Sequence, residues 1–283
     1  MNLRSYWEAH RADYDALLFD IDGTLVGGRG ALPGAVAFLE SLRREKVPFA
    51  LLTNDANHST QEKCAIARRG GLPTSPDEIV SSGAALKDLV AARGWAGKRF
   101  FRLGLLGRPC HGEAAGLVMT GDRHDLPECF GVLGGEEYFD WCKDFHAALN
   151  FLLRHPEAPY VVPNPDSYWQ GANDTVGIGA GGQARFLCGL LAEMGAPREP
   201  IYLGKPYAPI YDCAIRYLRE RFPGFSGEDR KRILMVGDYL ASDILGGNRN
   251  GLTSVLVLTG NSDMAAVERA PQEQRPALIF DAL

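Results

Sequence analysis

The sequence predicts an α/β fold in which a parallel sheet is interrupted by a second, inserted α/β domain. Short apolar runs alternate with amphipathic helical stretches, which is typical of parallel strands joined by crossover helices. The runs form two outer groups, separated by a middle segment with strand and helix patterns of its own. We therefore expect a discontinuous core domain over residues 1–81 and 201–283, with the inserted domain over residues 82–200.

The first outer group predicts a strand–helix–strand–helix beginning. Its apolar runs are short enough for buried strands, and its second helical pattern stops at Gly70-Gly71, where glycine interrupts the helix. The expected strands are Ala16–Phe19 and Phe49–Leu52, and the expected helices are Gly34–Lys46 and Ser59–Arg69.

The last outer group predicts that the same sheet continues after the insertion. Its expected strands are Ile201–Leu203, Ile233–Val236 and Ser254–Leu258, with helices at Tyr207–Arg221 and Tyr239–Asn250. Within the insertion we expect strands near Arg99–Leu105, Phe130–Leu133 and Tyr160–Val162, and helices at Tyr138–Leu153 and Gln183–Met194.

The composition favours a globular protein and excludes several classes of partner. The chain has 283 residues, of which 46% are hydrophobic and 23% charged, enough for one large domain or two modest ones. Its net charge is −5 and its charges are interleaved, so it lacks the basic stripe that nucleic acid requires. Because no apolar run approaches the roughly 18 residues of a membrane span, we expect a cytoplasmic protein without a membrane partner.

The six cysteines are widely spaced and include no Cys-x-x-Cys pair. This spacing argues against a disulfide scaffold, and it predicts reduced, buried thiols. A zinc site is the alternative, with soft ligands available at Cys110, His111, His124, Cys129, Cys142 and His146. These spacings fit no compact zinc motif, so we favour the thiols.

Residues that can carry chemistry follow four of the predicted strands. Open α/β sheets place their sites at the carboxyl ends of strands, so such residues are expected to converge. The four stretches are Asp20-Ile21-Asp22-Gly23-Thr24-Leu25, Thr53-Asn54, Gly204-Lys205-Pro206 and Gly237-Asp238-Tyr239-Leu240-Ala241-Ser242-Asp243.

Each stretch alone also has a purely structural explanation. Asp-Gly commonly forms a turn, and Thr-Asn is an ordinary helix lead-in. A lone lysine is usually a solvated surface group, while Asp238 and Asp243 suit the start of a helix. Only the succession of all four, each directly after a strand, favours a catalytic site.

Taken in order, the four stretches resemble the motifs of the haloacid dehalogenase (HAD) superfamily. The position of the insertion, with Ser75–Gly83 and Asn164-Pro165-Asp166, resembles its class IIA branch, which includes sugar-phosphate, nucleotide, phosphoglycolate and p-nitrophenyl phosphatases. The resemblance extends from about Tyr14 to about Asp281 and is weakest over Gly97–Phe130. It implies a Rossmann-like core sheet with an inserted α/β cap domain that selects the substrate.

The resemblance implies that Asp20 is a nucleophile that takes up the phosphoryl group. Asp22 would protonate the leaving oxygen and then deprotonate the water that hydrolyses the aspartyl phosphate. Lys205 would balance the negative charge, while the Thr53 hydroxyl and the Asn54 backbone N–H would hold phosphoryl oxygens together with that lysine.

The resemblance also implies a Mg²⁺ cofactor. Magnesium prefers a few carboxylates together with water and phosphate oxygens. The expected protein ligands are the Asp20 side chain, the Asp22 backbone carbonyl and the Asp238 side chain, with Asp243 placed behind them.

In the inserted domain, Asn164, Asp166 and Tyr168 are the residues expected to face the leaving group. The alternative is a Pro-Asp turn with a packed aromatic pair, and loop position alone does not decide between the two.

The resulting prediction is a Mg²⁺-dependent phosphatase that hydrolyses a small phosphorylated metabolite. A phosphotransferase or mutase with the same intermediate and a non-catalytic binding protein are the alternatives, and a homodimer is compatible with the sequence. Residues 177–182 formally match Gly-x-Gly-x-x-Gly, but no strand–turn–helix nucleotide unit surrounds them. We expect these glycines to form a flexible turn before the helix at Gln183.

Overall fold

The computed structural model describes residues 2–170 and 175–283. Its contacts divide the chain into two compact units. The first unit comprises Met1–Thr53, Lys63–Val80 and Lys205–Leu283, and the second comprises Asn54–Glu62 and Ser81–Gly204. Residues 54–62, predicted as core, thus group with the second unit, while the domain limits at 81/82 and 200/201 stay a prediction.

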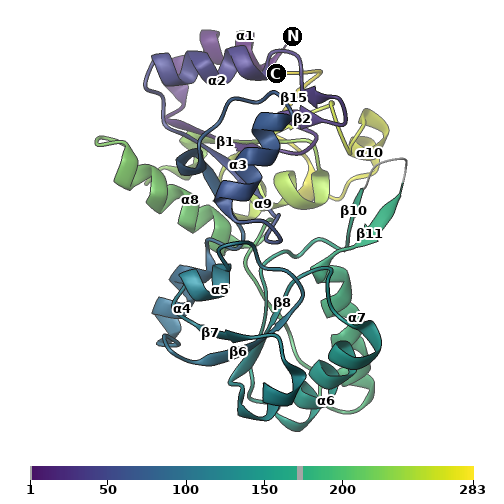
Figure 1. Ribbon diagram of the computed structural model, residues 1–283. Helices are drawn as coiled ribbons and strands as arrows, with labels where there is room; N and C mark the ends of the chain where they lie inside the picture. Colours follow the sequence, from purple (N-terminus) through teal and green to yellow (C-terminus); the bar gives the residue numbers. More distant parts are fainter. Residues whose placement is uncertain (1, 171–174) are drawn as a thin grey trace. The chain divides into compact units, whose positions relative to one another are not determined.

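The first unit is built on a six-stranded sheet with the order β15-β14-β13-β1-β4-β5 (Figure 1). The register runs parallel between β1 and both of its neighbours, and onward through β14 to β15. The strands are β1 (Ala16–Asp20), β4 (Phe49–Thr53), β5 (Ile79–Ser81), β13 (Ile233–Gly237), β14 (Thr253–Val257) and β15 (Leu278–Phe280). The parallel α/β core predicted from the sequence is confirmed.

Burial explains why the central strands consist of continuous apolar runs. Every residue of β1, β4 and β13 is buried, because helices cover both faces of a parallel sheet. Leu17 and Phe19 join a cluster with Phe38 of helix α2 (Ala35–Arg44). Helix α8 (Ala208–Arg221) packs against β4. Burying one such Leu or Phe side chain contributes roughly 1.5–3 kcal/mol.

The remaining elements of the first unit are helices and one short hairpin. The hairpin pairs β2 (Val26–Gly27) with β3 (Gly30–Ala31). The helices are α1 (Leu3–Ala9), α2 (Ala35–Arg44), α3 (Thr60–Arg69), α8 (Ala208–Arg221), α9 (Leu245–Arg249) and α10 (Met264–Arg269). Helix α3 starts in the second unit and continues in the first, since the unit boundary falls between Glu62 and Lys63.

The second unit has its own parallel sheet, with the order β12-β9-β8-β6-β7. In Figure 1, α6 and α7 lie on one side of this sheet and α4 and α5 on the other. The strands are β6 (Arg99–Leu103), β7 (Val118–Thr120), β8 (Gly131–Gly134), β9 (Tyr160–Val162) and β12 (Ile201–Tyr202), and β10 (Tyr168–Gln170) pairs with β11 (Val176–Ile178) in a separate hairpin. The helices are α4 (Leu86–Arg93), α5 (His111–Ala114), α6 (His146–Arg154) and α7 (Ala180–Glu193).

One strand was assigned to the wrong sheet. The sequence predicted Ile201–Leu203 as part of the core sheet, but β12 pairs in parallel with β9, so that Ile201 lies opposite Val161. A short apolar run carries no information on its neighbour, which tertiary pairing alone decides. Lys205 therefore follows the last strand of the inserted sheet and not a core strand.

The glycine-rich stretch was also interpreted wrongly. Helix α7 begins at Ala180, three residues before the expected start, and it includes Gly181 and Gly182. A Cβ on Gly181 would lie 1.9 Å from the Pro165 carbonyl oxygen, and one on Gly182 would lie 2.3 Å from the Ser167 carbonyl oxygen. These glycines therefore allow the helix to pack closely on the loop before β10.

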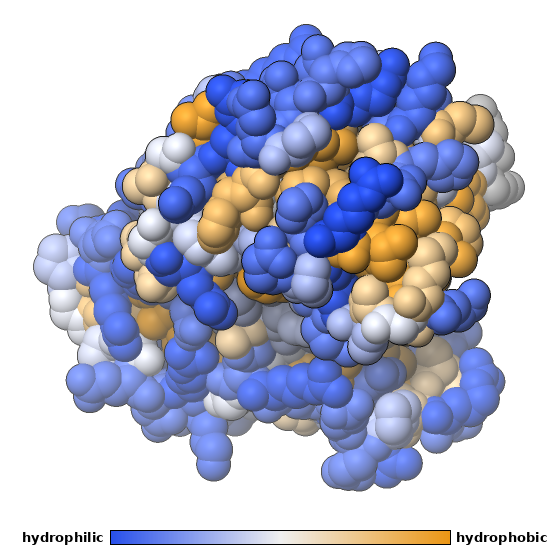
Figure 2. Space-filling model, turned by 90° about the horizontal axis from the view of Figure 1, so that it is seen from below, coloured by the Kyte–Doolittle hydropathy of each residue, from blue (hydrophilic) through white to orange (hydrophobic). Residues whose placement is uncertain are grey.

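Two expected helices begin with a π-helical turn, at Trp141–Phe145 and Leu240–Ile244, before continuing as α6 and α9. The thiol prediction holds in part: all six cysteines are free, but Cys142 is exposed. Figure 2 shows apolar patches on a largely hydrophilic face. In the part of the chain that the structure describes, every helix is too short or too polar to cross a membrane.

Candidate active site

Asp20 lies at the carboxyl end of β1, where only 7% of it is exposed. The chain then turns through Gly23, whose φ of +90° L side chains rarely adopt. A Cβ at Gly23 would also lie 2.4 Å from Asp238 Oδ2. The glycine of the Asp-x-Asp-Gly stretch is thus required both by the backbone and by the close approach of a second acid.

Lys205 is a buried cation beside Asp20, with 3% of its side chain exposed. Its ammonium donates to Asp20 Oδ1 and, at 2.7 Å, to Asp243 Oδ1. Although burial opposes the charge, the pKa of Lys205 lies well above its usual value because the two carboxylates stabilise the ammonium. The lysine therefore carries its charge inside the protein.

Asp238, directly after β13, is 1% exposed. Its Oδ2 accepts hydrogen bonds from the backbone N–H of Asn261 at 2.6 Å and from the side-chain amide of the same residue at 2.8 Å. Its Oδ1 has the Thr24 hydroxyl at 3.4 Å. Sequence reasoning did not find Asn261, because an asparagine in a loop after a glycine carries no distinguishing pattern.

Three buried carboxylates converge at this edge of the sheet. One oxygen from each of Asp20, Asp238 and Asp243 lies within 4.8 Å of the others, in the described part of the chain. Three carboxyl groups thus lie beside the ammonium of Lys205, and when all three are ionised their excess of negative charge favours a bound cation. The all-oxygen donor set suits Mg²⁺.

The contacts of the acids separate their roles toward such a cation. Asp243 has both oxygens engaged, Oδ1 by Lys205 and Oδ2 by the Tyr239 backbone N–H at 3.1 Å. Asp238 keeps one oxygen with only the long contact to Thr24. Asp20 and Asp238 therefore have carboxylate oxygens more open to a ligand role than Asp243, while the ligand roles expected from the sequence stay a prediction.

Burial shifts the titration of all three acids. It raises the pKa of Asp20 to about 7, against the lowering effect of Lys205. It likewise raises the pKa values of Asp238 and Asp243 to about 6. Each shift means that burial disfavours the ionised form. A bound cation would relieve that cost by favouring the carboxylates.

Thr53 ends β4 and is 2% exposed, and Asn54 is the first residue of the second unit. The Asn54 carbonyl accepts a hydrogen bond from the Ser82 hydroxyl at 2.8 Å. Its side-chain amide donates to Asp166 Oδ1 at 3.0 Å. Asn54 is thus fixed at both its backbone and its side chain, whereas its contact with phosphate stays a prediction.

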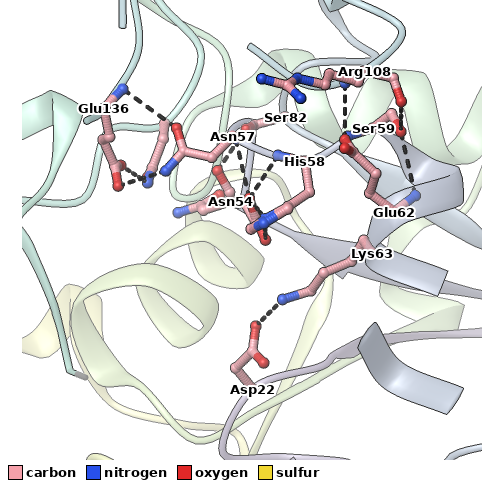
Figure 3. A network of polar contacts seen from close by, with 12 residues as sticks. Asp22, Asn54, Asn57, His58, Ser59, Glu62, Lys63, Ser82, Arg108 and Glu136 are labelled. Atoms are coloured by element: carbon pink, nitrogen blue, oxygen red, sulfur yellow. Dashed lines mark hydrogen bonds and ion pairs between the residues drawn. The ribbon is translucent and has the colours of Figure 1, made fainter. Parts of the chain in front are cut away.

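Asp22 differs from its neighbour Asp20, since 65% of its side chain is exposed. Its Oδ2 pairs at 2.6 Å with the ammonium of Lys63, a residue of α3 that is itself buried (Figure 3). Sequence analysis missed Lys63 because a lysine within an amphipathic helix normally faces water. The pair holds the carboxylate of Asp22 in one direction.

The three residues predicted to face the leaving group have different environments. Asn164 and Asp166 are joined by a hydrogen bond from the Asp166 backbone N–H to Asn164 Oδ1 at 2.9 Å. Tyr168, at the start of β10, has 49% of its surface exposed. The structure also reveals a buried acid that sequence reasoning missed, Glu136, to which Asn164 donates at 2.6 Å.

Comparison with known proteins agrees with this architecture. A haloacid dehalogenase-like hydrolase family model matches residues 17–110, and a HAD-hydrolase-like model matches residues 202–283. Chronophin from Rattus norvegicus is 31% identical over 88% of this chain and 77% of its own length. The ribonucleotide monophosphatase NagD of Escherichia coli is 26% identical over 94% of this chain and 96% of its own.

A solved structure has a similar fold over most of the chain. The glycerol phosphate phosphatase of Mycobacterium tuberculosis, crystallised with magnesium, superposes with a TM-score of 0.79 at 26% identity, covering 96% of this chain and 76% of that one. The chain therefore belongs to the haloacid dehalogenase-like hydrolases, in the class IIA branch that the motifs predicted. The predicted enzyme class, a phosphoric monoester hydrolase of the HAD type, is confirmed at the level of the family, and the predicted Mg²⁺ cofactor agrees with the magnesium of this relative and with the buried acids.

Proposed function

We propose that this enzyme hydrolyses small phosphomonoesters through an aspartyl phosphate formed on Asp20. The observation that carries the proposal is the buried arrangement at the end of β1. There one carboxylate is paired with a buried ammonium and lies beside two further acids. Nucleophilic attack by a carboxylate splits a difficult hydrolysis into two easier steps.

In the first step an oxygen of Asp20 attacks phosphorus, and the bond between phosphorus and the leaving oxygen breaks. Asp22 donates its proton to that oxygen. In the second step water attacks phosphorus, Asp22 takes the water's proton, and the Asp20–phosphorus bond breaks to release phosphate. Lys205 stabilises the negative charge of the transferring group, and Thr53 and the Asn54 backbone N–H hold its oxygens.

Asp20, Asp238 and the Asp22 carbonyl are the residues proposed to hold Mg²⁺, and Asp243 would fix Lys205 behind them. The ion would neutralise phosphoryl oxygens and orient the phosphate for in-line attack.

Substrate identity is proposed only as a class. The names of the relatives indicate a nucleotide monophosphate and glycerol phosphate, both of which are small monoesters of an alcohol. We propose that this chain takes a monoester of similar size, which Asp166 and Tyr168 help to select.

A release assay over a panel of phosphomonoesters tests the proposal. Sugar phosphates, nucleotides, phosphoglycolate and p-nitrophenyl phosphate should release free phosphate in the presence of Mg²⁺. Transfer of the phosphoryl group to an added alcohol in place of water would favour the alternative function, a phosphotransferase. The absence of any turnover, with Mg²⁺ bound, would leave a non-catalytic binding protein.

A further inference from the structure

Glu136 is a buried acid that the proposed reaction does not use. It lies two residues beyond β8 in the second unit, and 3% of it is exposed. Within the described residues, the contacts that its carboxylate makes are hydrogen bonds from uncharged donors. An ionisable group buried in this way is costly and needs hydrogen bonds to replace water.

Three donors converge on this carboxylate. The side-chain amide of Asn164 donates to Oε1 at 2.6 Å, and the backbone N–H of Ala180 donates to the same oxygen at 3.1 Å. The side-chain amide of Asn57 donates to Oε2 at 3.0 Å (Figure 3). Ala180 is the first residue of α7, whose amino end favours negative charge. Burial nevertheless raises the pKa of Glu136 above its usual value.

The backbone at Glu136 is fixed as well. Its carbonyl accepts a hydrogen bond from Leu105 N–H at 2.7 Å, and its N–H donates to Asn57 Oδ1 at 3.3 Å. A Cβ on the preceding Gly135 would lie 2.1 Å from the Leu105 carbonyl oxygen, so only glycine permits this approach. The backbone that carries the Glu136 carboxylate is therefore held in place.

The contacts of Glu136 close a ring between two loops. From Glu136 the ring passes to Asn164, whose Oδ1 accepts from the Asp166 backbone N–H, and then to Asn54, whose amide donates to Asp166 Oδ1. Asn54 and Asn57 belong to the same loop, and Asn57 returns to Glu136. The ring thus ties the loop after β4 to the loop before β10.

We propose that Glu136 is a positioning residue that holds the phosphate-binding loop at Asn54 and the substrate-selecting loop at Asp166 in one fixed relation. The inference rests on the proposed function, which gives those two loops their roles. A carboxylate is the group this position requires, because all three partners on it are donors and a carboxylate is purely an acceptor. A glutamine at position 136 would direct its side-chain N–H at the side-chain N–H of Asn57, and neither group could accept.

The test is a swap of donor and acceptor across the ring. Glu136→Gln places an amide against Asn57, and Asn57→Asp places a second carboxylate against Glu136, so each single variant breaks the contact. In the double variant Glu136→Gln/Asn57→Asp, the new amide donates to the new carboxylate, while Gln Oε1 still accepts from Asn164 and Ala180. Glu137→Gln is the matched control, because Glu137 is its exposed neighbour.

We expect kcat/KM for a nucleotide or glycerol phosphate to fall about tenfold or more in each single variant, about 1.4 kcal/mol of transition-state stabilisation. The double variant should recover most of that loss, and Glu137→Gln should match the wild type. Activity of Glu136→Gln equal to the wild type, or a double variant no better than the singles, would overturn the proposal.

Amide hydrogen exchange provides a second readout that does not depend on turnover. Exchange at residues 53–58 and 164–167 should accelerate together in Glu136→Gln and slow again in the double variant. If neither segment changes, Glu136 does not position them. A wild-type enzyme that turns over no phosphomonoester would instead refute the proposed function, and the exchange result would still decide the role of Glu136.

Discussion

Two buried acidic regions, one in each unit, differ in how their charges are stabilised. At the end of β1, Asp20 and its neighbouring acids are buried against an ammonium, with more negative charge than Lys205 balances. In the second unit Glu136 is also buried, but the donors that contact its carboxylate in the described part of the chain are uncharged. The first arrangement has an excess of negative charge that can act on a cation and, through it, on a phosphate. In the second, the hydrogen bonds of the carboxylate are used to hold the neighbouring loops. We therefore propose the chemistry for the first region and positioning for the second.

The largest effect expected from this difference is the loss of the nucleophile. Asp20→Asn should lower kcat by about 10⁴-fold or more, roughly 5.5 kcal/mol, because the amide replaces the carboxylate that is proposed to attack phosphorus. Initial rates on p-nitrophenyl phosphate give the measurement, and thermal unfolding shows whether the variant is folded. A variant with near-native hydrolysis would mean that Asp20 is not the nucleophile.

Removal of the metal should be nearly as severe. Chelation by EDTA should abolish turnover, and Ca²⁺ should inhibit, because its larger and looser coordination disturbs the in-line geometry. Full activity in EDTA would contradict the proposed metal site. Restoration by added Mg²⁺ is the control for damage by the chelator.

The raised pKa values of the acids predict a pH dependence of stability. Because the folded-state pKa values of Asp20, Asp238 and Asp243 rise from 3.8 to about 7, 6 and 6, the metal-free fold binds more protons than the unfolded chain in that window. The contribution of the site to stability should therefore fall as pH rises through the window. Mg²⁺ competes with those protons, so the rise in Tm that it causes should be larger near about pH 8 than near about pH 5. Equal shifts at both values would place the metal elsewhere.

A smaller effect is expected at Lys63, which lies outside the charged cluster. Lys63→Met should lower kcat by about tenfold to a hundredfold, in the range of general acid–base contributions, because Asp22 loses the contact that directs its carboxylate. Lys63→Arg should restore part of the activity. The exposed Lys87 offers a control, Lys87→Met, which should leave the rate unchanged. A loss confined to KM would show that Lys63 acts on binding and not on Asp22.

The smallest effect on chemistry is expected in the loop before β10. Asp166→Ala should change the ranking of substrates, chiefly through KM for larger ones, while hydrolysis of p-nitrophenyl phosphate stays within about tenfold, roughly 1.4 kcal/mol. Kinetics on the phosphomonoester panel test this. If every substrate were silenced equally, or none were affected, Asp166 would not select among them.

The central strands were predicted well from the sequence, because a strand that is buried on both faces of the sheet consists of a continuous apolar run. Strands β1, β4 and β13 fall within one residue of the expected limits, and α8 begins one residue after its expected start. Of the three-residue strands, β9 was predicted at its observed limits, whereas β5, β7, β10, β11 and β15 were missed. A run this short has no measurable period, so its pattern does not separate a strand from a loop. The placement of β12 failed for a different reason, because pairing between distant strands is a tertiary property.

The site was predicted to the extent that it consists of motifs at strand ends. Asp20, Lys205, Asp238 and Asp243 are brought together as the resemblance implied. Lys63 and Glu136 could not be found in this way, because the role of a charged residue outside a motif depends on the contacts that it makes after folding. The local sequence around each residue does not distinguish it from an ordinary solvated side chain.

The most direct test of the account is to locate the phosphoryl group on the enzyme during turnover. The reaction is quenched in acid while substrate is in excess, and the digested protein is analysed by mass spectrometry. With p-nitrophenyl phosphate, whose leaving group needs little protonation, we expect an acyl phosphate on the peptide that contains Asp20, and more of it in Asp22→Asn, where hydrolysis of the intermediate lacks its base. Phosphate on any other residue, or turnover without a phosphorylated enzyme in both proteins, would contradict it.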